Sequence, residues 1–334
     1  MGAAEREMIA KLAAAFPEFR EGMGIGDDAA LLRNDGTLAI GNDMLIEDVD
    51  FTASIPIELV AEKALASNLS DLAAMGASPL AFLLALGCPE SFLPQFDRFV
   101  KALAAVSRRY GIMLIGGDIS RAPQLILSIT AIGRVPARVL LRSGASPGQR
   151  IFISRPLGAS AAGLRLLTSG WTIAHDHKLV PPAGTDFGYA EREFASAAIM
   201  RHVAPEPEVT LGPKLAAMSE VTACIDISDG LSSDLKRLCE ASGTGAIVDW
   251  DRLPAFADLP AHARMVGAGV ADLVLHGGEE YALLFTSSLT ESQMSSRLGR
   301  VVYAIGRIAE GQEILLERDG KREVLPAGGY EHFA

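Results

Sequence analysis

A few acidic residues stand where a carboxylate has no obvious structural purpose. The clearest is Asp71, which lies within the nearly charge-free residues 64–77, three positions after Asn68. The Ala, Leu and Met content of that segment predicts a helix, and residues three apart share one helix face. Burying a carboxylate without a partner is very costly, so Asp71 needs a cation, strong hydrogen-bond donors or a metal. We therefore interpret Asp71 as a functional residue.

Further acids follow glycine-rich turns or interrupt strands, a placement that suits phosphate chemistry. This set consists of Asp27, Asp28, Asp43, Asp118, Asp226 and Asp229. Glycine lets backbone amides approach phosphate oxygens, and Mg²⁺ is usually held by a few carboxylates together with water and substrate phosphates. Paired metals also offset the charge of a phosphoryl transfer. The pattern predicts a site that gathers carboxylates around magnesium and phosphate.

Simpler roles remain open for single members of this set. Asp229 stands at the start of a predicted helix, where capping fits as well as metal ligation. Asp28 and Asp48 suit solvent-exposed turns better than ligation. Arg142 has the geometry to donate two hydrogen bonds to a phosphate, but a solvent-exposed linker arginine fits its spacing equally well.

The composition argues against several classes of protein. With 334 residues, 49% of them hydrophobic, the chain is expected to form two domains with sizeable cores. Its net charge of −11 argues against nucleic acid as the main partner, but it allows a nucleotide whose charge a divalent metal neutralises. No Gly-x-x-x-x-Gly-Lys-[Ser/Thr] motif occurs, which excludes a P-loop kinase.

Cysteine usage and hydropathy predict a cytoplasmic protein that does not enter the membrane. Cys88, Cys224 and Cys239 are widely scattered, which favours reduced thiols over disulfides or a zinc site. We expect Cys224 and Cys239 to be buried as small hydrophobic residues. Glycine and proline residues interrupt the apolar residues 72–89, so this stretch is predicted to be helix, turn and buried strand instead of a membrane span.

The elements that position these residues alternate between helix and strand. In the first half we expect helices at residues 4–15, 64–77 and 92–110 and strands at 38–46, 80–86, 112–115 and 125–132. In the second half we expect helices at 160–168, 189–203 and 211–219, a helix starting at Asp229, and strands at 150–154, 221–228 and 281–286. Residues 171–188 are predicted to form a polar loop in which His175 and His177 are solvent-exposed. A change in character at residues 136–148 predicts α/β domains at 1–137 and 138–334.

Several short motifs stand in the order found in one enzyme family. They are Gly-Ile-Gly-Asp-Asp-Ala-Ala-Leu-Leu at 24–32, Asn-Asp-Met-Leu-Ile-Glu at 42–47, Asn-Leu-Ser-Asp-Leu-Ala-Ala-Met-Gly-Ala at 68–77, Gly-Gly-Asp at 116–118, Arg-x-Gly-Ala-x-Pro-Gly at 142–148, Asp-Ile-Ser-Asp-Gly-Leu at 226–231, Gly-Gly-Glu-Glu-Tyr at 277–281 and Glu-His-Phe at 331–333. With these motifs the chain resembles the thiamine-monophosphate kinase family over nearly its whole length. Any one motif is weak, but the combination is highly specific.

The resemblance implies a fold, a dimer and a reaction. The superfamily also contains aminoimidazole ribonucleotide synthetase, selenophosphate synthetase and a hydrogenase maturation factor. The implied fold has an N-terminal metal- and ATP-binding domain, whose sheet pairs into a barrel across a homodimer, and a C-terminal α/β domain. The implied reaction is the ATP-dependent phosphorylation of thiamine monophosphate to the diphosphate, with Mg²⁺. Because an acceptor phosphate is already ionised and no covalent nucleophile stands out, we expect direct in-line transfer.

Position by position, the resemblance assigns roles to particular residues. The implied magnesium ligands are Asp27, Asp43, Asp71, Asp118, Asp226 and Asp229. The implied ATP contacts are Gly117, Asp118, Arg142 and Ser228, and the acceptor region comprises Asp50, Glu279 and Tyr330.

Some positions depart from the family pattern. Residues 41–42 are Gly-Asn where the family has Thr or Ser just before Asp43, which removes a hydroxyl ligand. Val100 stands where an aromatic residue often packs on adenine, and Phe99 is the alternative candidate for that contact. Asp50 replaces a usual His. An acid there suits contact with a cationic part of the acceptor, which we favour, but recruitment of another cation and a different acceptor are also open.

Two other functions remain open. One is a different ATP-dependent activity of the superfamily on another small phosphate acceptor. The hydrogenase maturation factor needs a C-terminal Cys where this sequence ends Glu-His-Phe-Ala, and selenophosphate synthetase needs a reactive Cys or selenocysteine near the N-terminus, where no Cys precedes Cys88. The other is a non-catalytic nucleotide-binding protein, which the loss of several acids would favour, but every acid of the implied magnesium set is present.

Overall fold

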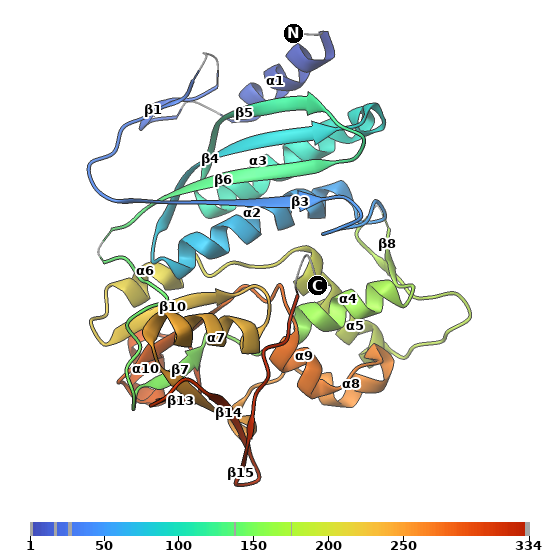
Figure 1. Cartoon of the computed structure of the whole chain (residues 1–334). Coiled ribbons are helices and arrows are strands. Elements are labelled where there is room, and N and C mark those ends of the chain that lie inside the picture. Colours follow the sequence, from blue (N-terminus) through green and yellow to red (C-terminus); the bar gives the residue numbers. More distant parts are fainter. Residues whose placement is uncertain (1–2, 17–18, 26–28, 137, 175, 331–334) are drawn as a thin grey trace.

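Two β-sheets, each covered by helices, form the two halves of the molecule (Figure 1). The computed structural model describes residues 3–16, 19–25, 29–136, 138–174 and 176–330. A four-stranded sheet lies in the N-terminal half, a seven-stranded sheet lies in the C-terminal half, and helix α2 (Ile57–Ala74) lies between them. The expectation of a two-domain mixed α/β fold is confirmed.

The N-terminal sheet has the strand order β3-β6-β4-β5. Its strands are β3 (Leu38–Ile46), β4 (Ser78–Cys88), β5 (Met113–Arg121) and β6 (Ile126–Arg134). Besides α2, the remaining elements of this half are α1 (Ala3–Ala15), the paired strands β1 (Gly22–Met23) and β2 (Leu31–Leu32), a 3-10 helix (Glu90–Gln95) and α3 (Phe96–Tyr110). The β3–β6 and β6–β4 pairs are antiparallel, whereas β4 and β5 run parallel and are joined through α3. This order makes β3 and β5 the two edges of the sheet.

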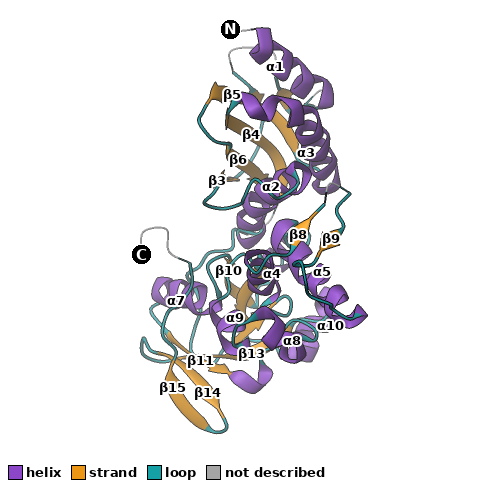
Figure 2. Ribbon diagram, turned by 90° about the vertical axis from the view of Figure 1, so that its right-hand side faces the viewer, coloured by secondary structure: helices purple, strands orange, loops and turns teal. Residues whose placement is uncertain are grey.

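Helix α2 is buried on nearly all sides, between the N-terminal sheet and the C-terminal domain (Figure 2). All its residues are buried except Glu58, Glu62 and Asp71. It packs on β3, β6 and α3 on one side and on β10 and α6 on the other. A helix that is apolar all round is typical of the interior of a protein. The helix begins at Ile57, well before the expected residue 64. The sequence did not indicate this start because the charged residues Glu58 and Glu62 interrupt the apolar pattern. In the structure both acids pair with arginines of α3.

The C-terminal sheet has the strand order β10-β12-β7-β13-β11-β14-β15. Its strands are β7 (Arg150–Ile153), β10 (Val221–Ile227), β11 (Gly245–Asp249), β12 (Ala282–Ser287), β13 (Tyr303–Ala309), β14 (Ile314–Arg318) and β15 (Lys321–Val324). The helices are α4 (Ala159–Thr168), α5 (Tyr189–Val203), α6 (Leu211–Ala216), α7 (Leu231–Ser242), a 3-10 helix (Trp250–Arg252), α8 (Leu259–Val266), α9 (Val270–His276) and α10 (Glu291–Leu298). Only β11 and β14 run parallel in this sheet, and its other neighbouring pairs are antiparallel.

The two halves approach each other closely where α6 meets α2. A Cβ atom at Gly212 would lie 2.0 Å from the backbone oxygen of Ala73, so only glycine fits this contact. The last turn of α2 is therefore fixed against the C-terminal domain.

Several expectations about single residues are wrong. Asp118 lies within β5, which continues through Gly117 instead of ending before it, because the backbone pairs with β4 throughout. Helix α7 begins at Leu231 with Gly230 as its N-cap residue, so Asp229 precedes the helix and does not cap it. Phe99 is 1% exposed and packs edge-on against Phe92 in the core, which excludes it as an adenine contact.

The predicted loop at residues 171–188 contains a short antiparallel pair, β8 (Thr172–Ile173) and β9 (Leu179–Val180). Trp171 is buried, and its ring lies 5.1 Å from that of Phe187. His177 is exposed, as predicted, and His175 lies outside the described residues.

Cys224 and Cys239 are buried, as predicted. Cys88, Cys224 and Cys239 are buried free thiols. In the part of the chain that the structure describes, the helices are too short or too polar to cross a membrane.

Candidate active site

Three carboxylates from three elements face one another at the junction of the two halves. Asp43 comes from β3, Asp71 from α2 and Asp226 from β10. Asp226 is 4% exposed, and Asp43 and Asp71 are half-buried. The charges of Asp43 and Asp226 both act on Asp71, and we call these three residues the acidic cluster.

One turn of α2 fixes both strands that carry the other two acids. The backbone N–H of Asp43 donates to Asn68 Oδ1 at 3.0 Å, which holds β3 against the helix. Ser70 Oγ donates to Asp226 Oδ2 at 2.7 Å, which holds β10 on the other side. The sequence Asn-Leu-Ser-Asp at 68–71 thus contributes one acid to the cluster and positions the other two.

Burial and mutual repulsion raise the pKa of every member of the acidic cluster. Burial raises the pKa of Asp71 to about 8, with further contributions from Asp226 and Asp43 and an opposing one from Arg142. The pKa of Asp43 is raised by burial and then by Asp50 and Asp229. Burial also raises the pKa of Asp226, although the Ser70 hydrogen bond opposes it. The cluster is short of positive charge, which a bound cation would supply.

A second group of charges surrounds the loop between β10 and α7. Asp234 Oδ2 accepts hydrogen bonds from the backbone N–H groups of residues 228–230, at 3.0, 3.1 and 3.1 Å. Arg237 Nη1 pairs with Asp229 and lies 2.8 Å from Asp234 Oδ1. Burial, Asp226 and Asp229 raise the pKa of Asp234 to about 6. Because Asp234 occupies the loop amides, Ser228 and Asp229 are left to meet a ligand through their side chains.

Two of the three predicted acceptor residues, Asp50 and Glu279, lie beside the buried Lys63. Glu279 forms an ion pair with Lys63 Nζ at 2.7 Å and approaches His202 Nδ1 at 3.2 Å. The Asp50 carboxylate accepts a hydrogen bond from the backbone N–H of Ile46 at 2.8 Å. Asp50 and Glu279 are linked through Lys63, whose Nζ also donates to the Asp50 carbonyl oxygen at 3.3 Å.

Arg142 and Tyr330 are predicted site residues that lie on other segments near the site. The charge of Arg142 acts on Asp71 and Asp226, so this exposed arginine lies near the acidic cluster. Tyr330 is 50% exposed, and its backbone N–H donates to the Asp229 carbonyl oxygen at 3.3 Å, which brings the C-terminal segment to the site.

Gly117 and Asp118 are the predicted residues that the chain does not bring to the acidic cluster. They lie on β5, at the opposite edge of the sheet from β3 and Asp43. Asp118 is exposed and accepts a hydrogen bond from Ser120 Oγ at 3.1 Å. Asp27, the remaining predicted ligand, lies outside the described residues.

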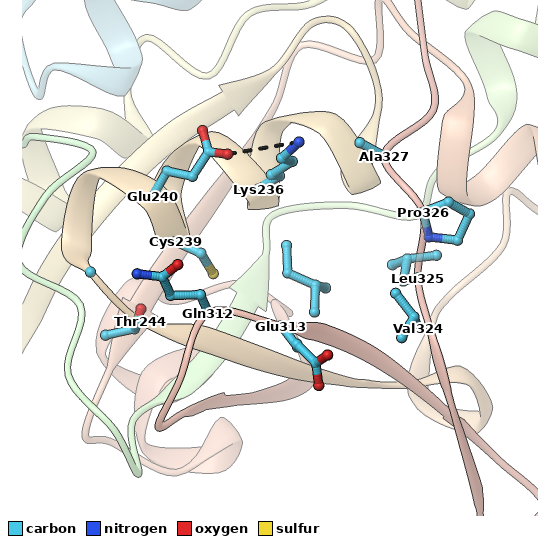
Figure 3. A pocket seen from close by; sticks show the side chains of 12 residues that line it. Lys236, Cys239, Glu240, Thr244, Gln312, Glu313, Val324, Leu325, Pro326 and Ala327 are labelled. Carbon is cyan, nitrogen blue, oxygen red and sulfur yellow. Dashed lines mark ion pairs between the residues drawn. The ribbon is translucent and has the colours of Figure 1, made fainter.

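Two cavities differ in their relation to these residues. A cavity of about 400 Å³ lies between the second half of α7 and residues 324–327, and it contains none of the predicted site residues (Figure 3). A cavity of about 320 Å³ lies between residues 48–55 and helices α4 and α5, and Asp50, Lys63 and His202 line it. The second cavity adjoins the candidate site.

Sequence reasoning missed the residues that hold the acids in place. They are Lys63, Ser70, His202, Asp234 and Arg237. Ser70 carried a signal, since it stands inside the Asn-Leu-Ser-Asp motif beside Asp71. Lys63 is the single cation in the otherwise uncharged residues 63–70, a signal of the same kind as that of Asp71.

Comparisons with known proteins agree with the two halves described above. Residues 26–135 match the AIR synthase related protein N-terminal domain, and residues 147–316 match the corresponding C-terminal domain. The thiamine-monophosphate kinase of Salmonella typhimurium is 39% identical over 320 residues, which cover 93% of this chain and 92% of that protein. That of Pyrococcus horikoshii is 30% identical over 323 residues, covering 95% and 94%.

The chain belongs to the thiamine-monophosphate kinase family.

Solved structures place the fold in the same family. A thiamine-monophosphate kinase from Stenotrophomonas maltophilia superposes with a TM-score of 0.78 at 34% identity, covering 96% of this chain and 97% of that one. AaThiL complexed with AMPPCP and TMP gives a TM-score of 0.75 at 29% identity, covering 89% and 87%. An E. coli hydrogenase maturation protein gives 0.74 at 17% identity, covering 98% of both chains, which shows a shared fold alone.

The acidic cluster suits a metal that is only partly enclosed by protein. Among the described residues, no group of three or more His, Cys, Asp or Glu side chains is arranged to hold a metal ion by itself, and this includes the acidic cluster. The available donors are carboxylate oxygens, which are hard ligands, and burial and the neighbouring acids raise the pKa of Asp71 more than the charge of Arg142 lowers it. Mg²⁺ commonly takes its remaining ligands from water and substrate phosphates, so an incomplete protein shell fits this family.

The raised pKa of Asp71 predicts how the metal-free protein responds to pH. The pKa is about 8 when the protein is folded, whereas an unfolded Asp titrates at about 3.9. Between these values the folded state binds a proton that the unfolded state has released, so the free energy of unfolding falls as pH rises from about 4 to about 8. Replacing Asp71 by Asn removes this loss and should stabilise the metal-free protein at about pH 8 by about 1 kcal/mol or more.

Thermal melts in a chelator across this pH range measure the difference between wild type and Asp71→Asn. The two curves should converge toward about pH 4, and Mg²⁺ should raise the melting temperature of the wild type more than that of the variant. Parallel curves at every pH would show that Asp71 has an ordinary pKa.

Proposed function

We propose that this chain phosphorylates thiamine monophosphate to thiamine diphosphate with ATP and Mg²⁺. The observation that carries the proposal is the acidic cluster at the junction of the two halves, where the pKa values of Asp43, Asp71 and Asp226 are raised even though the charge of Arg142 opposes the shift at Asp71 and Asp226. Family membership supports the reaction, since a related structure holds AMPPCP and TMP together. We further propose a cytoplasmic location, in keeping with the free thiols.

The proposed magnesium ligands are the acids at this junction and the two predicted acids elsewhere. Asp43, Asp71 and Asp226 would contact the metal from the two halves of the chain, with Asp229 beside them. Asp27 and Asp118 complete the proposed ligand set. Bound magnesium would neutralise the charge of the ATP phosphates and of the transferring group.

Direct transfer to the acceptor is favoured over a covalent enzyme intermediate. Burial raises the pKa of Cys88, Cys224 and Cys239, so these thiols are protonated and poor nucleophiles at neutral pH. An acceptor phosphate is ionised already and needs no strong general base. Catalysis then depends on positioning and on electrostatic stabilisation.

We propose that Gly117, Asp118, Arg142 and Ser228 contact ATP. Arg142 supports this role because its charge lowers the pKa of Asp71, which places a guanidinium close to where phosphates would meet the metal. Ser228 lies in the loop before α7, next to Asp229.

We propose a homodimer, which would account for exposed apolar residues of the N-terminal sheet. Ile40 and Met44 of β3, an edge strand of this sheet, are 65% and 49% exposed. Pairing of two such sheets into a barrel would cover these residues.

The acceptor is tested by following ADP release with thiamine monophosphate beside other small phosphate esters. The proposal predicts Mg²⁺-dependent release that is fastest with thiamine monophosphate, and a loss of at least about a hundredfold in kcat for Asp71→Asn, because a metal-binding charge is removed. The variant should melt at or above the wild-type temperature without metal. Faster turnover of another phosphate ester would assign the chain to a different acceptor, and ATP binding without any turnover would indicate a non-catalytic protein.

The role of Asp50 is tested by Asp50→Ala and Asp50→His. If the Asp50 carboxylate contacts the cationic part of the acceptor, both changes should raise the KM for thiamine monophosphate several-fold while the KM for ATP stays within about twofold. Melting temperatures control for loss of the hydrogen bond to Ile46. Wild-type constants in both variants would mean that Asp50 has no part in acceptor binding.

A further inference from the structure

Lys63 is a buried cation at the centre of the candidate site. It lies on α2, and its side chain is 3% exposed. Lysine is almost never fully buried unless it is paired, because removing an ammonium group from water is costly. A buried lysine between two domains therefore needs a partner that justifies its position.

The partner of Lys63 is the carboxylate of Glu279. Lys63 Nζ lies 2.7 Å from Oε1 and 2.9 Å from Oε2 of Glu279, so it contacts both oxygens. Its third contact, at 3.3 Å, is the backbone oxygen of Asp50. One ammonium group thus joins α2, the turn before β12 and the segment after β3.

His202 approaches the same carboxylate but does not balance its charge. His202 Nδ1 lies 3.2 Å from Glu279 Oε2 and 3.1 Å from Ser160 Oγ. Burial and the charge of Lys63 lower the pKa of His202 well below its usual value, so the ring is neutral. Lys63 is consequently the positive charge that faces Glu279 in this network.

The backbone of Glu279 is fixed as well. Its φ angle is 58°, in the left-handed region, and its N–H donates to the Ser228 carbonyl oxygen at 2.6 Å. With its backbone held by the Ser228 loop and its side chain held by Lys63, Glu279 has little freedom to reorient. The cavity of about 320 Å³ that Lys63, Asp50 and His202 line opens beside it.

We propose that Lys63 is a positioning residue for the acceptor, which holds the Glu279 carboxylate and the Asp50 backbone in one fixed arrangement. This inference rests on the proposed function, because it takes Glu279 and Asp50 as acceptor contacts. It assigns Lys63 to acceptor affinity and not to ATP affinity, since its contacts are with these two residues and not with the acidic cluster.

The test is a double-mutant cycle that combines Lys63→Met with Glu279→Gln. Steady-state KM values for thiamine monophosphate and for ATP are measured for both single variants and the double variant, with melting temperatures alongside. Lys63→Met should raise the KM for thiamine monophosphate about tenfold or more, with the KM for ATP within about twofold of wild type. In the Glu279→Gln background the same change should have an effect of about twofold or less, because the charge that Lys63 positions is gone.

A control separates this result from a general effect of losing an ion pair. Arg297→Met removes an ion pair of the same 2.7 Å length, with Glu220, on the exposed helix α10. Both KM values should be unchanged. If Lys63→Met does not fold, the double variant, which removes both charges of the pair, is compared with Glu279→Gln alone.

Three outcomes would overturn the inference. They are equal increases in both KM values, an undiminished effect of Lys63→Met in the Glu279→Gln background, and a double variant that binds acceptor much less tightly than Glu279→Gln alone. A failure of the proposed function looks different, since the wild-type protein itself would then release no ADP with thiamine monophosphate.

Discussion

The repulsion among Asp43, Asp71 and Asp226 is the constraint around which this molecule is built. Each acid is supplied by a different element, and Asp71 and Asp226 come from different halves of the chain. Bringing them together raises their pKa values and lowers stability at neutral pH when no cation is bound. Because this arrangement lowers the stability of the metal-free protein, we infer that it is there to bind a cation and the ligand of that cation.

The burial of apolar side chains on α2 offsets the destabilising repulsion among the three acids. Leu65, Leu69 and Leu72 are at most 1% exposed, and burying each such side chain contributes about 1.5–3 kcal/mol. The close approach of α6 at Gly212 leaves no space between the end of α2 and the C-terminal domain. Asp71 is thus held in an unfavourable environment by contacts that have nothing to do with its charge. This local conflict between stability and charge is typical of functional sites.

Polar side chains on α2 divide the site into two regions. Asn68 and Ser70 fix the backbone of Asp43 and the carboxylate of Asp226, at the metal end of the helix. Two turns earlier, Lys63 fixes Glu279 and Asp50, at the proposed acceptor end. A single rigid helix therefore sets the distance between the two regions, which suits a reaction that depends on positioning.

The sequence predicted most elements and singled out Asp43, Asp71 and Asp226, but it did not show how these acids are held and it missed Asp234. Strand β3 coincides with the predicted residues 38–46, because its apolar pattern is bounded by turn residues. The start of α2 was missed because Glu58 and Glu62 interrupt the apolar pattern that predicts the helix. Their partners are arginines of α3, far away in the sequence.

Pairings between residues far apart in sequence could not be inferred from local pattern. The contacts of Lys63 with Glu279 and of Ser70 with Asp226 are examples, and both of them span the two halves of the chain. The separation of Asp118 from Asp43 likewise depends on strand order, which no single segment specifies.

Crystals grown with Mn²⁺ and a non-hydrolysable ATP analogue would test the central claim most directly, because Mn²⁺ replaces Mg²⁺ at oxygen sites and can be located by its anomalous signal. The account predicts manganese within coordination distance, roughly 2 Å, of the Asp71 carboxylate and of at least one oxygen of Asp43 or Asp226. Manganese bound only elsewhere, with these three acids still free of metal while the nucleotide is bound, would contradict it.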